Sequence, residues 1–130
     1  DMHTMDILNN NCYFYGDYAI CGTRGWFYEE VKGEAHDRKI MLREVGRLET
    51  SLKAAGDKTK LVFLHYPPKY LGYECPEILE LLDVYHVPLC CYGHIHSRGC
   101  RSAFQGIYHD TEFRLLSADY ISFCPRRILP

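Results

Sequence analysis

Two short apolar runs, at residues 61–64 and 89–92, constrain the fold of this chain more than any other feature. Each has the length of a buried strand, and each is followed by residues that end a strand: two prolines soon after the first, a glycine after the second. Between them, apolar residues recur at helical spacing over residues 76–85. A strand, a helix and a strand in this order predict a βαβ unit, whose parallel strands end at one edge of a sheet.

Histidines lie at that predicted edge. His65 directly follows the first run, and His94 and His96 follow the second. In a locally extended backbone, His94 and His96 would point to the same side, with Ile95 facing away. Imidazole nitrogens are frequent metal ligands, and the carboxyl edge of an open α/β sheet is where ligands and metals bind. We therefore expect His65, His94 and His96 to converge on one crevice and to bind metal.

A structural zinc site is the alternative explanation for this histidine-rich stretch. It would use the cysteines and histidines of the second run and the segment after it, namely Cys90, Cys91, His94, His96 and Cys100. Such sites prefer paired ligands with spacings such as C-x2–4-C and H-x3–5-H, and this stretch contains neither pair. The spacing therefore favours a strand-end metal site.

The segments around these histidines resemble the last two of the five signature blocks of the calcineurin-like metallophosphoesterases. Other segments are similar to small bacterial members of this family and to its closing strand. The matching segments are residues 19–26, 64–68, 92–96, 114–120 and 123–125. The resemblance implies a metallophosphoesterase α/β sandwich, with mixed sheets flanked by helices. It also implies that His65 and His94 bind one metal of a dinuclear pair and that His96 binds the other.

The first three signature blocks of the family have no counterpart in this chain. These blocks (Asp-x-His, Gly-Asp-x-x-Asp and Gly-Asn-His-Asp or Glu) supply the remaining ligands, including the carboxylate that bridges the metals. We therefore expect residues 1–130 to form the carboxyl-terminal half of one metallophosphoesterase domain, with no internal boundary and without the amino-terminal strands. The catalytic residues would belong to the missing amino-terminal half, which is then a partner of this chain. The chain alone is expected to have little hydrolytic activity.

The activity implied by the resemblance is hydrolysis of a phosphomonoester or phosphodiester by a metal-activated water. Two divalent or trivalent ions of manganese, iron or zinc suit ligation by imidazole and carboxylate groups. The expected substrate is a phosphoester small molecule or a nucleotide. The alternative is a non-catalytic metal-binding or interaction module that acts as it stands.

Charge and cysteine content restrict the partners and the compartment. A formal net charge of −2 gives no electrostatic basis for binding nucleic acid, and no apolar run is long enough to span a membrane. The seven cysteines are odd in number and lie mostly in apolar runs, which indicates reduced thiols in a cytoplasmic protein. Five scattered arginines are expected on a solvated surface: Arg98, Arg101, Arg114, Arg126 and Arg127.

The loop after another predicted strand holds Arg24 and Trp26, the only tryptophan. Arg24 could bind a phosphate through two parallel hydrogen bonds, and Trp26 could form a wall of the substrate pocket. A salt bridge and ordinary packing explain the same two residues equally well. Both assignments stay open at the level of sequence.

The remaining segments predict further elements of an α/β fold. Apolar and aromatic residues around a Gly-Asp pair predict a hairpin over residues 12–21, and apolar residues at three- and four-residue spacing predict a helix over residues 35–55. Two strands are expected around 106–109 and 112–117, whereas 70–75 and 97–106 are expected to be loops. Asp119, in the segment that resembles the closing strand, receives no role from that resemblance.

Overall fold

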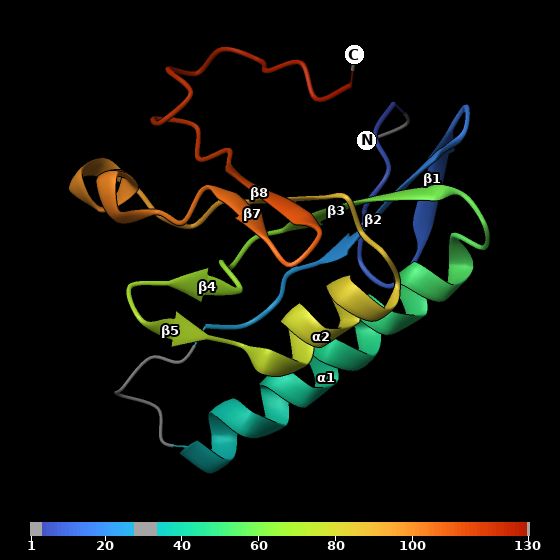
Figure 1. Ribbon diagram of the computed structural model, residues 1–130, viewed down its shortest axis with the longest axis horizontal. Coiled ribbons are helices and arrows are strands. Elements are labelled where there is room, and N and C mark those ends of the chain that lie inside the picture. Colours follow the sequence, from blue (N-terminus) through green and yellow to red (C-terminus); the bar gives the residue numbers. More distant parts are fainter. Residues whose placement is uncertain (1–3, 28–33, 130) are drawn as a thin grey trace.

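A six-stranded mixed sheet dominates the computed structural model, which describes residues 4–27 and 34–129 (Figure 1). The strands follow the order β1-β2-β3-β6-β8-β7 across the sheet. Their bounds are β1 Cys12–Tyr15, β2 Tyr18–Thr23, β3 Thr59–Leu64, β6 Leu89–Tyr92, β7 Gly106–Tyr108 and β8 Thr111–Leu115. The four central strands are parallel, and β1 and β7 pair antiparallel at the two edges. The fold class is therefore α/β, as predicted.

Two helices cover one face of this sheet (Figure 1). Helix α1 (Glu34–Ala54) connects β2 to β3, and helix α2 (Pro76–Val84) connects β3 to β6. The strand residues that face the helices, among them Val62, Cys90 and Phe113, are fully or almost fully buried in the main core. The predicted βαβ unit of β3, α2 and β6 is thus confirmed. No helix in the described part of the chain is long and apolar enough to cross a membrane.

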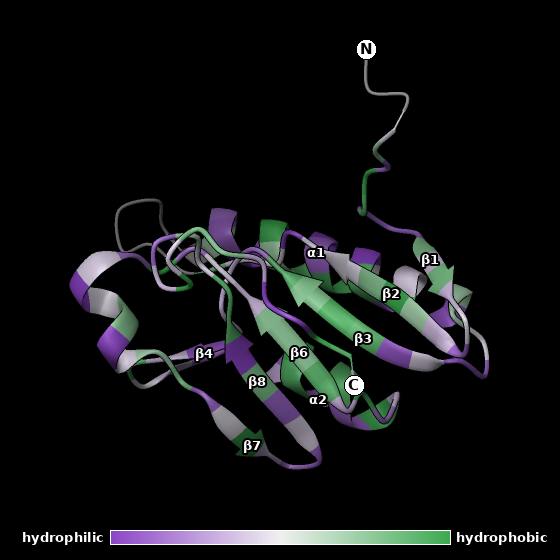
Figure 2. Cartoon of the chain, turned by 90° about the horizontal axis from the view of Figure 1, so that it is seen from above, coloured by the Kyte–Doolittle hydropathy of each residue, from purple (hydrophilic) through white to green (hydrophobic). Residues whose placement is uncertain are grey.

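The opposite face of the sheet carries a second, smaller core. Leu61, Leu89 and Cys91 alternate with the helix-facing residues and are buried on this side. Ile128 and Leu129 of the carboxyl-terminal segment pack against them. Figure 2 shows the apolar colouring of the central strands β3 and β6 and the more hydrophilic colouring of β8 beside β6. A sheet that is apolar on both faces accounts for the nearly continuous apolar runs in the sequence.

Two segments predicted as loops contain regular structure. Residues 69–74 form a two-stranded hairpin of β4 (Lys69–Tyr70) and β5 (Tyr73–Glu74), and a 3₁₀ helix, η1, spans Ser97–Ser102. The turn of this hairpin places Leu71 at a φ of +45°. Gly72 follows at a φ of +79° and is a turn residue, but leucine before it is not typical of a two-residue hairpin turn, and each strand has only two residues. The turn between β7 and β8 uses His109 and Asp110, one residue earlier than predicted.

The four parallel strands end at the same level. Their last residues are direct register partners across the sheet: Thr23, Leu64, Tyr92 and Leu115. The segments that follow therefore leave the sheet from a single edge. This edge holds the histidines expected to bind metal.

Candidate metal and phosphoester site

The imidazoles of His65 and His94 meet at the carboxyl edge of the sheet. Nε2 of His65 lies 3.2 Å from Nδ1 of His94, and the two ring centroids are 5.1 Å apart. His65 is exposed and His94 is partly buried, so the pair is open to solvent. The sequence prediction that these two histidines converge is confirmed. Two ring nitrogens in this position either share one proton or direct both lone pairs at one cation.

Backbone hydrogen bonds connect the strand ends that carry this pair. The amides of His65 and Tyr66 both donate to the carbonyl oxygen of Arg24, at 3.1 and 3.0 Å. The amide of Gly93 donates in turn to the carbonyl oxygen of His65, at 3.1 Å. The segments after β2, β3 and β6 are thereby joined laterally. This connection holds the two imidazoles on a rigid base.

His94 adopts a backbone conformation that a strand does not have. Its φ is +68°, in the left-handed region that is uncommon for a residue with a side chain. The expectation of an extended backbone from His94 to His96 is therefore wrong, and the alternation argument does not apply there. The same left-handed conformation occurs at turn residues elsewhere in this structure, among them Leu71 and His109, so at His94 it marks a turn directly after β6.

His96 makes its polar contact with a carboxylate. Its Nδ1 lies 2.8 Å from Oδ1 of Asp119, in the segment after β8. The other carboxylate oxygen of Asp119 accepts the amide of Ser97 at 2.7 Å. The pKa of Asp119 is lowered by that backbone hydrogen bond first and by His96 second. A charged carboxylate on Nδ1 favours the proton on that nitrogen and leaves Nε2 as the lone pair that can bind a metal.

Asp119 is, with Phe27 of the adjacent pocket, a residue of this site that the sequence did not predict. It is 22 residues from Ser97 and 23 from His96 in the chain, and only the pairing of β8 beside β6 brings them together. No local spacing could have indicated this contact. The one available signal was an acidic residue shortly after a predicted strand.

A pocket of about 240 Å³ lies beside the histidines. Both His94 and His96 line it, together with aromatic and small residues. The ring centroid of Phe27 is 6.2 Å from that of His94. The ring of Tyr66 packs against both histidines, with its centroid 4.5 Å from that of His94 and 4.8 Å from that of His65. The remaining lining residues are Pro67, Tyr70, Ile95 and Gly99. The pocket therefore combines an imidazole edge with an aromatic wall.

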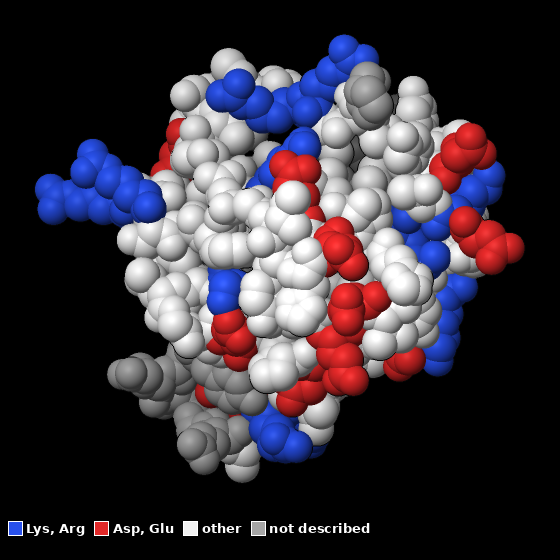
Figure 3. All heavy atoms as spheres, viewed as in Figure 1, with Lys and Arg blue, Asp and Glu red and all other residues white. Residues whose placement is uncertain are grey.

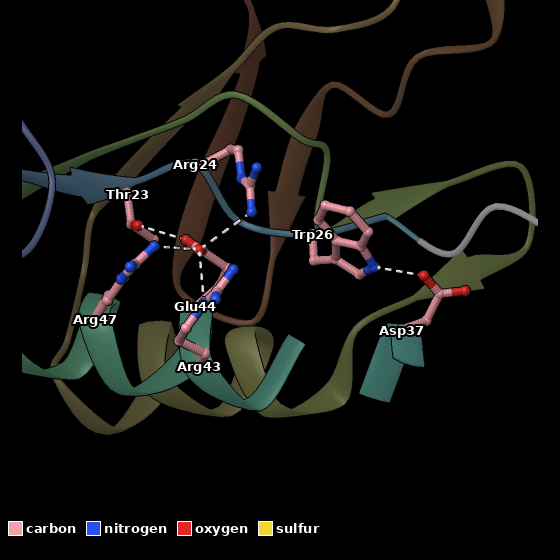
Figure 4. Close-up of polar contacts among 7 residues, drawn as sticks. All are labelled: Thr23, Arg24, Trp26, Asp37, Arg43, Glu44 and Arg47. Carbon is pink, nitrogen blue, oxygen red and sulfur yellow. Dashed lines mark hydrogen bonds and ion pairs between the residues drawn. The ribbon is translucent and has the colours of Figure 1, made fainter. Parts of the chain in front are cut away.

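Arg24 lies at the same edge, but its guanidinium is directed toward helix α1. It forms an ion pair with the buried carboxylate of Glu44 at 3.4 Å (Figure 4). Glu44 also accepts hydrogen bonds from the hydroxyl of Thr23 at 2.8 Å and from Arg47 at 2.7 Å. The Arg24 side chain keeps 46% of its surface exposed. Its ion pair is the structural role that the sequence analysis left open, and a role in phosphate binding stays a prediction.

Trp26 is almost fully buried and does not line the histidine pocket. Its indole N–H donates to the carboxylate of Asp37 on α1 at 3.0 Å (Figure 4), and its ring lies 5.5 Å from that of Tyr66. The adjacent residue, Phe27, lines the pocket instead. Trp26 thus packs against the ring of Tyr66, which in turn contacts the histidines. The predicted role of Trp26 in substrate binding stays a prediction.

The separation of the two facing nitrogens of His65 and His94 is compatible with one metal ion between them. Two ligands with metal–nitrogen bonds of about 2.0–2.1 Å lie roughly 2.9–3.4 Å apart at octahedral to tetrahedral angles, and the observed separation is 3.2 Å. His96, oriented by Asp119, offers one further imidazole nitrogen. Within residues 4–27 and 34–129, no three His, Cys, Asp or Glu side chains form a group that could hold a metal ion. Any ion bound here would complete its coordination with water, a phosphoester or a partner.

Comparison with known proteins identifies no relative of this chain: no protein family, curated protein or solved structure matches it.

Proposed function

We propose that this chain provides the histidine part of the active site of a metal-dependent phosphoesterase. The observation that carries the proposal is the 3.2 Å approach of His65 and His94 at the carboxyl edge of a parallel sheet. The motifs Leu64–Pro68 and Tyr92–His96 and the α/β sheet are consistent with a metallophosphoesterase sandwich. The proposed substrate is a small phosphoester or a nucleotide, with manganese, iron or zinc as the metal.

In this proposal each histidine has a defined role. His65 and His94 hold one ion between their facing nitrogens, and His96 offers Nε2 to a second ion while Asp119 holds its ring by Nδ1. The bound ions would polarise the phosphoryl oxygens and lower the pKa of the attacking water. Phe27 and Tyr70 in the adjacent pocket would contact the organic part of the ester and limit the access of water to it.

The proposal includes a second half of the active site. The described residues bring one carboxylate, that of Asp119, to the histidines, whereas a dinuclear centre needs a bridging carboxylate and several further oxygen ligands. We propose that an amino-terminal half of the same domain supplies them and that the chain alone hydrolyses esters poorly.

The cysteines of the structure are unpaired, which supports a reducing, cytoplasmic compartment.

A non-catalytic metal-binding or interaction module is the second candidate function. The observation that favours it is the absence, among the described residues, of a complete set of three metal ligands. Such a module would bind a metal ion through His65 and His94 but would have no affinity for phosphoesters that depends on this metal.

Calorimetric titration with phenyl phosphate separates the two functions. The chain is titrated once in the presence of Mn²⁺ or Zn²⁺ and once in EDTA. We expect the ester to bind with higher affinity in the presence of the metal, and this gain to be lost in a His65→Ala/His94→Ala variant. An ester affinity that is the same with metal and with EDTA, although the metal itself binds, would support the module and refute the phosphoesterase.

A further inference from the structure

A second pocket, of about 410 Å³, lies between β8 and the carboxyl-terminal segment. Its volume falls within the range of about 300–1,000 Å³ that is typical of small-molecule sites. The lining residues come from the end of β8, from the segment that follows it and from the loop before β7: Gln105, Arg114, Leu115, Leu116, Tyr120, Ile121, Arg126, Arg127 and Ile128. None of them is a histidine of the metal site.

Positive charge gathers around this pocket. Three of its lining residues are arginines, and none is acidic. Arg114 is neutralised by Glu112, which accepts two hydrogen bonds from it at 2.8 and 3.0 Å. Arg126 has no hydrogen bond or ion pair with any described residue, and the contact of Arg127 is its Nε with the carbonyl oxygen of Leu129. The uncompensated charge of the pocket therefore comes from Arg126 and Arg127.

Figure 3 shows this arrangement on the surface. Basic atoms lie along the top of the molecule, where the carboxyl-terminal segment runs in Figure 1, and they border a hollow. Arg126 and Arg127 leave two positive charges at this pocket that have no acidic partner among the described residues. A bound anion would compensate this charge, and guanidinium groups match phosphate oxygens through paired hydrogen bonds.

A tyrosine hydroxyl adds a donor that does not depend on charge. The hydroxyl oxygen of Tyr120 accepts a hydrogen bond from the side-chain amide of Gln105 at 2.8 Å. The side-chain oxygen Oε1 of Gln105 accepts one from the backbone amide of Leu115 at 3.1 Å. Because the Tyr120 oxygen accepts the Gln105 amide, the hydroxyl proton of Tyr120 remains available for donation to another group. No acceptor for this proton is present among the described residues. An oxygen of a ligand in the pocket would be a suitable one.

The apolar part of the lining indicates what else the ligand carries. Leu116 and Ile121 are partly buried, Ile128 packs on the sheet, and Tyr120 is 44% exposed. A lone inorganic anion would leave this surface uncovered, whereas a flat or apolar organic group would cover it.

We propose that this pocket binds a small organic phosphate, with Arg126 and Arg127 on the phosphate and the aliphatic residues and Tyr120 on the organic group. This site is separate from the proposed metal centre and does not depend on it. Tyr120 follows Asp119 directly and donates its amide to that carboxylate at 2.9 Å. A ligand on Tyr120 therefore lies one residue from the group that orients His96.

Calorimetric titration with AMP in EDTA tests the proposal, because EDTA removes any contribution of a metal centre. We expect saturable binding, weakened at least about tenfold in an Arg126→Ala/Arg127→Ala variant. The matched control is Arg38→Ala/Arg101→Ala, which removes the same charge from two exposed residues outside the pocket and should change the affinity less than about twofold. Circular dichroism of both variants verifies that they are folded.

Four results would overturn the proposal. Equal weakening in the two double variants would show that only the overall charge matters. Adenosine binding as tightly as AMP would refute recognition of the phosphate, and inorganic phosphate binding as tightly as AMP would refute recognition of the organic group. The absence of saturable AMP binding to the unmodified chain would refute the site itself. Because the titration contains no free metal, none of these results bears on the proposed phosphoesterase activity.

Discussion

At the scale of single residues, Asp119 sets the tautomer and the orientation of the His96 imidazole. Its carboxylate contacts Nδ1 of His96 and accepts two backbone amides, those of Ser97 and Tyr120. Three contacts on one carboxylate keep it in place and hold the imidazole in one orientation. Carboxylates behind metal-binding histidines have this function in many metal sites, where their loss typically lowers metal affinity about 10- to 100-fold.

We expect Asp119→Ala to weaken binding of the second Mn²⁺ or Zn²⁺ ion, the one assigned to His96, by about 10-fold or more, because His96 would lose its fixed tautomer and orientation. Calorimetric titration with each metal measures the effect. Asp110→Ala is the matched control, since it removes an exposed carboxylate from the turn between β7 and β8. An affinity in Asp119→Ala equal to that of the control would show that Asp119 does not support a metal ligand.

Sequence reasoning reached the histidines of the site but not their surroundings. His65 and His94 could be placed together because each follows an apolar run, and parallel strands end at one edge. Asp119 and Phe27 could not be placed, because their contacts depend on the lateral order of strands and on a left-handed turn at His94 that no local pattern encodes. The arginine pocket was missed for the same reason, since the path of the carboxyl-terminal segment decides it.

At the scale of elements, helix α1 is docked on the sheet by polar contacts as well as by its apolar side. Glu44 is fully buried and is contacted by the hydroxyl of Thr23 and by Arg47. Two turns later in the same helix, the hydroxyl of Ser51 accepts the amide of Gly22 at 3.0 Å. These contacts join the helix to the end of β2. The prediction of helix 35–55 was accurate from periodicity, but two buried carboxylates, Glu44 and Asp37, were not foreseen.

We expect Glu44→Ala to lower the free energy of unfolding by about 2–4 kcal/mol, because it removes several buried hydrogen bonds and leaves Thr23 without its acceptor. Urea denaturation measures the change. Glu49→Ala on the same helix is the control; its partly exposed carboxylate pairs with Lys53 and accepts the hydroxyl of Tyr85 at 3.3 Å, so its loss should cost only about 1 kcal/mol. A cost for Glu44→Ala no larger than that of Glu49→Ala would refute this account of the helix contact.

At the scale of the whole molecule, both faces of the sheet bury thiols. Burial raises the pKa of Cys21 from its ordinary value of 9.0 to about 11, with a smaller contribution from Cys12, and burial also raises the pKa of Cys91 to about 11. Cys21 belongs to the core under the helices and Cys91 to the opposite core. Ionisation of these thiols is therefore coupled to the unfolding of both sides of the sheet.

The sign of this coupling predicts an alkaline loss of stability. A thiol whose pKa is raised by folding contributes its full stabilisation below pH 9, and this contribution is lost as the pH rises toward 11. We expect the free energy of unfolding to fall over this interval, by up to about 1.4 kcal/mol per pH unit for each thiol. Urea denaturation under reducing conditions at several pH values measures the slope.

Matched variants test whether the buried thiols cause this dependence of the free energy of unfolding on pH. Cys21→Ala/Cys91→Ala should flatten the dependence on pH, whereas Cys124→Ala, which removes an exposed thiol, should leave it unchanged. The same slope in the double variant and in the unmodified chain would contradict the prediction.

Titration with Zn²⁺ measures whether His65 and His94 together bind a metal ion. We expect saturable binding to the unmodified chain, weakened at least about tenfold by His65→Ala and by His94→Ala. The control is His36→Ala, which removes an exposed histidine on α1 and should leave the affinity unchanged. Zn²⁺ affinity that is equal in all four proteins would contradict metal binding by this pair and leave the 3.2 Å contact as a hydrogen bond between two imidazoles.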